Sequence, residues 1–536
     1  MARFRSLFGQ VRRRLAVEDG YTMIAAIGGM SLISVLAAGA LAASNGDLNL
    51  VQRNLDYKRA HAAAQAGVAD YSFHLNNDNS YWARCTAVPS PNAVNQNGST
   101  AKRRAVPGPA GASYAIELIP ATGKSSCDPS KPAETMLEQG SLNTGSFRIR
   151  STGYAGNAKV SVVATYKRAS LLDYVYFTQL ETLDPVTYWS TTMINGAYTQ
   201  CSKFRREGRQ SVNIPGTSQK CIEINFVSGD AIDGPLHTND DLLVCGTPTF
   251  GRSAADVIEV SAGLPGWQKN SNCSNNTPTF KGPLVTTAPV LTPPPTNGKL
   301  KDIAGAAYTF TGQTRITLNG ANIKVKVGTG STVEKPIPTS GVVYVQNDPA
   351  SSCTASYSPY TRTDLMYPST SSCGNAIVRG GYSGQLTIAA ANDIIIDDDL
   401  IRSGSGLLGL VANNFVRVYH PLEDSDQSTS YGDCNGTDSD SWQGNSHQHD
   451  LRIDAAILAI NHSFIVDHYN CGHDLGELEV NGAISQKFRG TVGTTNDTGY
   501  IKDYNYDDRL RYQEPPNFLD PVESAWHIQR ETLDFE

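Results

Sequence analysis

An uncharged, largely apolar stretch from Tyr21 to Ala43 decides how the rest of this chain can be arranged. It holds 23 residues without one Asp, Glu, Lys or Arg. A helix rises about 1.5 Å per residue, so a helix of this stretch can reach across roughly 30 Å of hydrocarbon. The sequence therefore predicts a transmembrane helix near the start of the chain, with most of the 536 residues lying beyond it.

A basic leader precedes the apolar stretch and ends in Glu18-Asp19-Gly20. Such a leader before an apolar run usually indicates a secretory signal peptide. Two features favour another interpretation, because the run is too long for an ordinary signal and a glycine, not an A-x-A site, marks the boundary. The arginines of the leader are Arg3, Arg5, Arg12, Arg13 and Arg14.

Together the leader, its final glycine and the apolar run resemble the N-terminus of a type IV prepilin. The resemblance implies that a prepilin peptidase cuts between Gly20 and Tyr21 and that the new N-terminus is methylated. Two positions depart from the family, which usually has Phe where this chain has Tyr21 and Glu where it has Ala25. The second departure points away from a major, repeating pilin and towards minor pilins and pseudopilins.

An amphipathic helical pattern continues beyond the apolar stretch to about Leu75. The segment 59–71 resembles the helix of PilX-type minor pilins, and the strand–turn–strand pattern at 146–168 resembles the hairpin that packs on that helix. The alternative is a simple signal anchor followed by a coiled stalk. The apolar stripe predicted from spacings of three, four and seven consists of Leu48, Val51, Leu55, Ala62, Ala66, Ala69 and Phe73.

The remainder of the chain is rich in strand and turn signals. After a proline-rich segment, short apolar runs bounded by Gly and Asn recur from about residue 299, a pattern typical of a parallel β-helix, with an irregular β-sandwich as the alternative. The predicted class is α+β: a long N-terminal transmembrane and amphipathic helix, then a β-rich ectodomain whose C-terminal part is β-helix-like. The predicted units are a leader (1–20), a helix (21–75), a pilin-like β-rich region (76–281), a proline-rich linker (282–298), a β-solenoid-like domain (299–490) and a capping tail (491–536).

All ten cysteines follow the apolar stretch, which suggests disulfides in an oxidising compartment. Sequence alone does not fix their connectivity, and none shows the CxxC spacing of a zinc or redox motif. In sequence order the couples are Cys85/Cys127, Cys201/Cys221, Cys245/Cys273, Cys353/Cys373 and Cys434/Cys471.

Three groups of polar residues are candidate chemical sites. A metal is conceivable at Asp233, His237, Asn239, Asp240 and Asp241, but turn-forming roles are favoured. Asp393 and Asp397-Asp398-Asp399 resemble the acidic clusters of β-helical polysaccharide enzymes or a calcium site; Asp397 and Asp399 share a strand face, and a solvated turn is favoured. The histidines His447, His449, His468 and His473 match no closed zinc ligand set.

The functional hypothesis is a minor pilin or pilus-associated surface protein that is not an enzyme and needs no cofactor. A net charge of −7 without a basic block beyond the leader argues against a nucleic-acid partner. The expected partners are the membrane, prepilin peptidase, other pilins or pilus assembly proteins, and a surface glycan. The expected location is the bacterial cell membrane, with a single pass and an exposed head for assembly or adhesion. The alternative is a membrane-anchored β-helical enzyme or adhesin acting on surface glycans.

Overall fold

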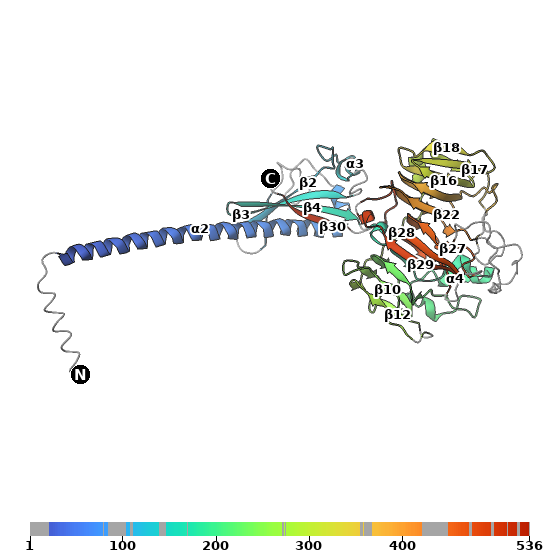
Figure 1. Cartoon of the computed structure of the whole chain (residues 1–536), viewed down its shortest axis with the longest axis horizontal. Coiled ribbons are helices and arrows are strands. Elements are labelled where there is room, and N and C mark those ends of the chain that lie inside the picture. The colour runs from blue at the N-terminus through green and yellow to red at the C-terminus, as the bar shows by residue number, and fades with distance from the viewer. Residues whose placement is uncertain are drawn as a thin grey trace.

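A computed structural model shows a long helix, a small sheet beside the end of that helix, and a large β-rich head (Figure 1). The helix is α2 (Tyr21–Asn77), and its N-terminal half projects well beyond the sheet (Figure 1). The described residues are 21–78, 80–83, 103–107, 111–138, 146–168, 170–270, 273, 275–353, 357, 367–420, 449–470, 474–494, 498–511, 513–522 and 526–534.

The expected fold class, α+β with a transmembrane helix, is wrong. The chain is mostly β, with 40% of its residues in strands against 21% in helices. Within the described ranges, no helix is both long and apolar enough to cross a membrane. Charged side chains from Asp47 onward make the second half of α2 polar. This finding conflicts with the single pass expected from the sequence.

The second half of α2 packs on a five-stranded antiparallel sheet, and the two together are called the stalk domain. The sheet has the order β1-β2-β3-β4-β30, so its last strand comes from the far end of the chain. The head is therefore an insertion between two neighbouring strands of the stalk domain. The bounds are β1 (Arg104–Ala105), β2 (Ala112–Ile119), β3 (Phe147–Ala155), β4 (Ala158–Arg168) and β30 (Trp526–Asp534).

The stripe by which α2 contacts the sheet differs from the predicted one. Among the predicted members Ala62 and Ala69 are exposed, and Phe73 is 62% exposed. Alanines lie on both faces of this part of α2. The face that packs on the sheet is the one that brings the helix backbone closest to β3. A Cβ on Gly153 of β3 would lie 1.9 Å from the carbonyl oxygen of Ala60. The buried stripe is Ala60, Ala63, Ala64, Gly67, Val68, Tyr71 and Leu75.

Aromatic rings fill the space between α2 and the sheet. The Phe147 ring stacks on Tyr166 at 5.2 Å and meets Trp526 edge-on at 4.8 Å. The Tyr166 hydroxyl donates to the Val68 carbonyl across 3.1 Å, so its polar end is satisfied by the helix backbone. Trp526 belongs to β30, and the C-terminal strand therefore completes this core.

The head is a coil of parallel strands. One face runs β15-β19-β21-β23-β26-β28-β5-β8-β11-β14, and every neighbouring pair in that order is parallel. Such parallel stacking is what a β-helix requires and what a sandwich lacks. The earlier head strands are β5 (Tyr176–Leu180), β6 (Phe226–Val227), β7 (Ala231–Asp233), β8 (Leu236–Thr238), β9 (Leu242–Cys245), β10 (Thr249–Phe250), β11 (Ile258–Val260), β12 (Trp267–Lys269), β13 (Thr279–Phe280) and β14 (Leu284–Val285).

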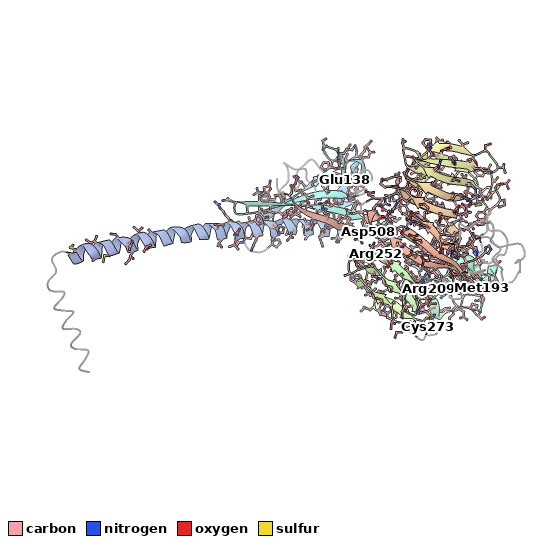
Figure 2. All side chains as sticks on the ribbon, viewed as in Figure 1. Glu138, Met193, Arg209, Arg252, Cys273 and Asp508 are labelled. Carbon is pink, nitrogen blue, oxygen red and sulfur yellow. A yellow bond between two sulfur atoms is a disulfide. The ribbon has the colours of Figure 1, made fainter. Side chains whose placement is uncertain are left out.

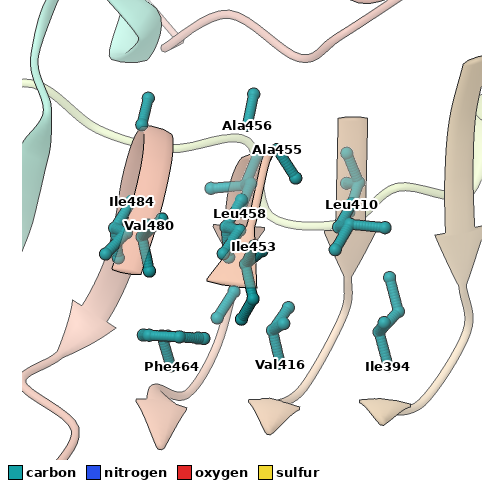
Figure 3. Close-up of a cluster of buried hydrophobic side chains, with 14 of the residues drawn as sticks. Ile394, Leu410, Val416, Ile453, Ala455, Ala456, Leu458, Phe464, Val480 and Ile484 are labelled. Atoms are coloured by element: carbon teal, nitrogen blue, oxygen red, sulfur yellow. The ribbon is translucent and has the colours of Figure 1, made fainter. Parts of the chain in front are cut away.

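The later head strands begin with an antiparallel cap and then wind as rungs. Inward residues stack from rung to rung, as in the column of Ile394, Val416 and Phe464 (Figure 3). The strands are β15 (Thr309–Thr311), β16 (Thr314–Gly320), β17 (Asn322–Val327), β18 (Val333–Pro336), β19 (Val342–Gln346), β20 (Ala376–Tyr382), β21 (Gln385–Ala390), β22 (Ile394–Arg402), β23 (Leu407–Ala412), β24 (Val416–Val418), β25 (Leu451–Ile453), β26 (Ala456–Ala459), β27 (Phe464–Val466), β28 (Asp474–Phe488) and β29 (Gly499–Tyr506).

The order of rungs in space differs from the order in the chain. The chain first builds β5 to β14 at one end, then crosses to the other end and winds back (Figure 1). The last rungs, β28 and β29, pair with β5 and β7 of the first part. The coil thus begins before residue 281, where the sequence analysis places a boundary. The segment 491–536 supplies both a rung (β29) and a stalk strand (β30).

The proline-rich segment makes the crossing between the two ends of the coil. Asn239 Nδ2 donates to the Leu291 carbonyl across 2.6 Å, and Asn239 Oδ1 accepts from the Leu291 amide across 2.9 Å. Further on, Asn297 Nδ2 donates to the Val411 carbonyl at 2.8 Å. The segment is thus a strap bonded along the coil. It leads into the short helix α5 (Lys299–Ala304).

Candidate functional site

The N-terminal half of α2 carries a surface of exposed apolar side chains. Met30 is 70% exposed, Ile33 68% and Leu36 63%. Ala60 is the first buried residue of α2 among those whose side chains the structure describes. The exposed apolar residues of this half are Met23, Ile27, Met30, Leu32, Ile33, Val35 and Leu36, and Leu50, Val51 and Leu55 follow before the sheet begins.

Polar groups within this surface are satisfied by the helix itself. Ser31 Oγ donates to the Ile27 carbonyl and Ser34 Oγ donates to the Met30 carbonyl, each across 2.7 Å. A Cβ built on Gly28 or on Gly29 would meet nothing within 4 Å. Burying one large apolar side chain is worth about 1.5–3 kcal/mol, so the segment gains strongly from any partner that covers it. The candidate site is therefore an exposed apolar surface that an apolar partner could cover.

The predicted cleavage site borders this surface. Tyr21 is the first residue of α2, whereas Gly20 and the rest of the leader lie outside the described residues. Cleavage between them would leave a mature chain that starts at the first helical residue.

Among the described cysteines of the head, three disulfides are formed. They link Cys201 to Cys221, Cys245 to Cys273 and Cys353 to Cys373, with Cα separations between 4.6 and 5.6 Å. Cys127 is also disulfide-bonded. Cys85, Cys434 and Cys471 lie outside the described residues. The bonds fit an oxidising compartment, where small strands and loops are fixed covalently.

The polar residues at 233–241 form a structural network. His237 Nδ1 lies 2.8 Å from Glu259 Oε2, and its Nε2 lies 3.0 Å from Asn239 Oδ1. Arg209 lies in the head (Figure 2). It donates to Asp240 across 2.5 Å, and the Arg205 amide donates to Asp240 as well. Burial, and then the neighbouring Asp240, raise the pKa of Asp241. Within the described part of the chain, no group of three His, Cys, Asp or Glu residues could hold a metal ion.

The acidic residues at 393–399 are occupied by arginines and do not converge as a catalytic pair. Asp397 is paired with Arg315 and Arg379. Asp393 accepts from Arg417 Nε at 3.1 Å and from Tyr367 Oη at 2.8 Å. Asp399 accepts from the Arg452 amide. Asp393 and Asp397 therefore act as partners of arginine side chains.

The structure separates the predicted histidine cluster. His449 is exposed and lies 2.9 Å from Asp450 Oδ2, whereas His468 is buried, with its Nδ1 2.6 Å from the His420 carbonyl. His447 and His473 lie outside the described residues. The sequence pattern did not single out His420. Burial lowers the pKa of this histidine to about 4. No spacing signal connects it to His468, because the two meet only through neighbouring rungs.

Comparisons with known proteins give structural matches but no sequence matches. No family model matches the chain, and no curated protein matches it. Among solved structures, the chain is similar to the crystal structure of the competence-associated pilin ComZ from Thermus thermophilus. The two are 12% identical, with a TM-score of 0.27 over 89% of this chain and 97% of that chain. A TM-score of this size does not establish a shared fold.

Proposed function

We propose that this chain is a pilus-associated surface protein that assembles through the N-terminal half of α2. The exposure of Met30, Ile33 and Leu36 is the observation that supports the proposal. Water-exposed apolar groups on so long a segment are unfavourable unless a partner covers them. The partners proposed are the corresponding helices of other pilins.

Processing by a prepilin peptidase is part of the same proposal. Cleavage between Gly20 and Tyr21 would remove five arginines and start the mature chain at an uncharged helix. A charged leader would be costly to place among packed apolar helices, because buried charges need partners.

The size of the head supports a minor subunit over a major one. The head is inserted between β4 and β30 and forms most of the chain (Figure 1). If every subunit of a helical filament carried such a head, neighbouring heads would compete for the same space. The head would be displayed at the cell surface or pilus, for assembly or adhesion.

Two equally exposed apolar residues of α2 provide a matched test. Leu36 is 63% exposed in the free half of the helix, and Phe73 is 62% exposed beside the sheet. We expect Leu36→Asp to remove the chain from sheared filaments and Phe73→Asp to leave it there. Both variants should fold, since neither side chain is buried. Co-purification of Leu36→Asp with filaments at the unmodified level would contradict the proposal.

A further inference from the structure

The two parts of the coil meet where β28 pairs with β5 and β29 pairs with β7, and the second of these pairings is called the joint. Asp503 pairs with Ala231 in this ladder, so the preceding residues, Lys502 and Asp230, come together although 272 positions separate them in the chain. At the joint the last strand of the coil in chain order, β29, lies beside the early strand β7.

Lys502 and Asp230 are in direct contact at this joint. Lys502 Nζ lies 3.0 Å from Oδ1 and 3.0 Å from Oδ2 of Asp230, so the nitrogen faces both carboxylate oxygens. The two side chains are only 15% and 6% exposed. Asp230 is further fixed by the Val227 amide, which donates to Oδ2 across 3.0 Å.

A second cation, Arg489, acts on Lys502. Phe226 is fully buried, and the Arg489 guanidinium lies 3.5 Å from the centre of its ring. Arg489 also contacts Glu181 Oε2 at 3.2 Å. Burial lowers the pKa of Lys502, Asp230 opposes that change, and Arg489 adds to it. The lysine therefore has more of the neutral amine, the form that acts as a nucleophile, than a lysine in water.

We propose that Lys502 and Asp230 join in an intramolecular amide bond after the chain folds. One proton moves from the Lys502 ammonium to the Asp230 carboxylate, leaving an amine beside a carboxylic acid. The lone pair of Nζ then forms a bond to Cγ. The Cγ–O bond breaks, and the hydroxyl leaves with a second proton from Nζ as water. An ammonium and a carboxylate thus become a secondary amide and one water molecule, with no further reagent.

A second buried pair in the same chain serves as an internal control. Lys167 Nζ lies 2.9 Å from Glu514 Oε1, and their side chains are 4% and 9% exposed. Burial lowers the pKa of Lys167, but the surrounding carboxylates outweigh it, so the net direction is upward. Lys167 therefore holds its proton more firmly than Lys502 does, and we expect this second pair to remain an ion pair.

Mass spectrometry of the full chain tests the proposal. After reduction of the disulfides, the folded chain should weigh one water molecule less than its sequence, and digestion should give a branched peptide that joins Lys502 to Asp230. Lys502→Arg and Asp230→Ala should restore the full mass, and exposed Lys326→Arg should not. The closed 272-residue loop should also make the denatured chain migrate faster than the variants on a denaturing gel.

Two results would overturn the proposal. One is a full mass for wild-type chain that unfolds cooperatively and is therefore folded. The other is a missing water that maps to any other pair, such as Lys167 and Glu514. Because both concern the wild-type chain, they hold even where a variant fails to fold.

Discussion

Lys167 and Glu514 form a buried ion pair, 2.9 Å long, at the point where the chain passes between stalk domain and head. Lys167 lies near the end of β4, on the way out, and Glu514 lies on the way back to β30. Burial, and then the neighbouring Glu514, raise the pKa of Asp520 to about 7, and burial raises the pKa of Glu514. The passage therefore contains more carboxyl groups than its one lysine can neutralise.

The stability of the chain should decline as pH rises towards neutrality. Asp520 has an ordinary pKa of 3.8 in the unfolded chain and about 7 in the folded chain. Between these values the folded chain binds more protons than the unfolded chain, so the free energy of unfolding falls as pH rises from about 4 to about 7. We expect Asp520→Asn to remove on the order of 1 to 2 kcal/mol of this dependence.

Urea unfolding at several pH values measures this effect. Asp302→Asn is the control, because Asp302 is an exposed carboxylate of α5 in the head. An Asp520→Asn variant with the same pH dependence as the Asp302→Asn variant would show that Asp520 ionises normally.

Removing the buried guanidinium of Arg417 should destabilise the head. Its Nε lies 3.1 Å from Asp393 Oδ2 and its Nη1 2.7 Å from Asp467 Oδ2, and all three side chains are buried. Arg417→Met would leave two buried carboxylates without their cation, a loss of about 3–5 kcal/mol.

Arg315 provides the comparison for this prediction. It also pairs with a carboxylate, Asp397, but it is 36% exposed and Arg379 shares the same partner. We expect Arg315→Met to cost under about 1 kcal/mol, because solvent and the second arginine compensate. Thermal unfolding of both variants is the measurement. An equal loss of stability in Arg417→Met and Arg315→Met would mean that burial does not determine how much these ion pairs stabilise the head.

Gly20→Ala should block processing of the leader. A prepilin-type cut after Gly20 would give a mature chain that begins at Tyr21, and alanine at that position should leave the chain starting at Met1. Glu18→Ala, two residues before the cut, is the control and should still be processed. N-terminal sequencing of the chain from its native host distinguishes these results. A wild-type chain that retains Met1 would favour an unprocessed anchor.

Local sequence patterns predicted some secondary-structure elements but not the pairing of strands that lie far apart in the chain. The hairpin expected at 146–168 is confirmed as β3 and β4, since alternation and a Gly-Asn turn are local signals. The pairing of β28 with β5 and of β29 with β7 was not predictable, because these partners lie far apart in the chain. The same holds for β30, whose return to β4 makes the head an insertion.

The candidate interface on α2 could also be predicted only in part from the sequence. An apolar run at 21–43 is visible in the sequence, but its exposure depends on where the sheet ends along α2. The buried stripe was assigned to Ala62, Ala66 and Ala69 in place of Ala60, Ala64 and Val68, because alanines occupy both faces of this segment. Gly153 of the sheet decides which face of α2 is buried, because it lets the helix backbone approach at Ala60 and Ala64. The spacing of residues within the helix carries no information about this glycine.

Gly153 is the residue that most directly controls how α2 docks on the sheet. A Cβ there would lie 1.9 Å from the Ala60 carbonyl oxygen and 2.4 Å from the Ala64 amide nitrogen, both backbone atoms of a helix that cannot yield locally. We therefore expect Gly153→Val to separate α2 from β3 and to lower the stability of the stalk domain by about 3 kcal/mol or more. Gly381→Ala, in strand β20, is the control, since its nearest neighbour would be the Ile401 carbonyl at 3.6 Å. Limited proteolysis should cut α2 near Ala60 in the first variant alone. Protection of α2 in Gly153→Val would show that helix and sheet can move apart by more than an ångström without losing their packing.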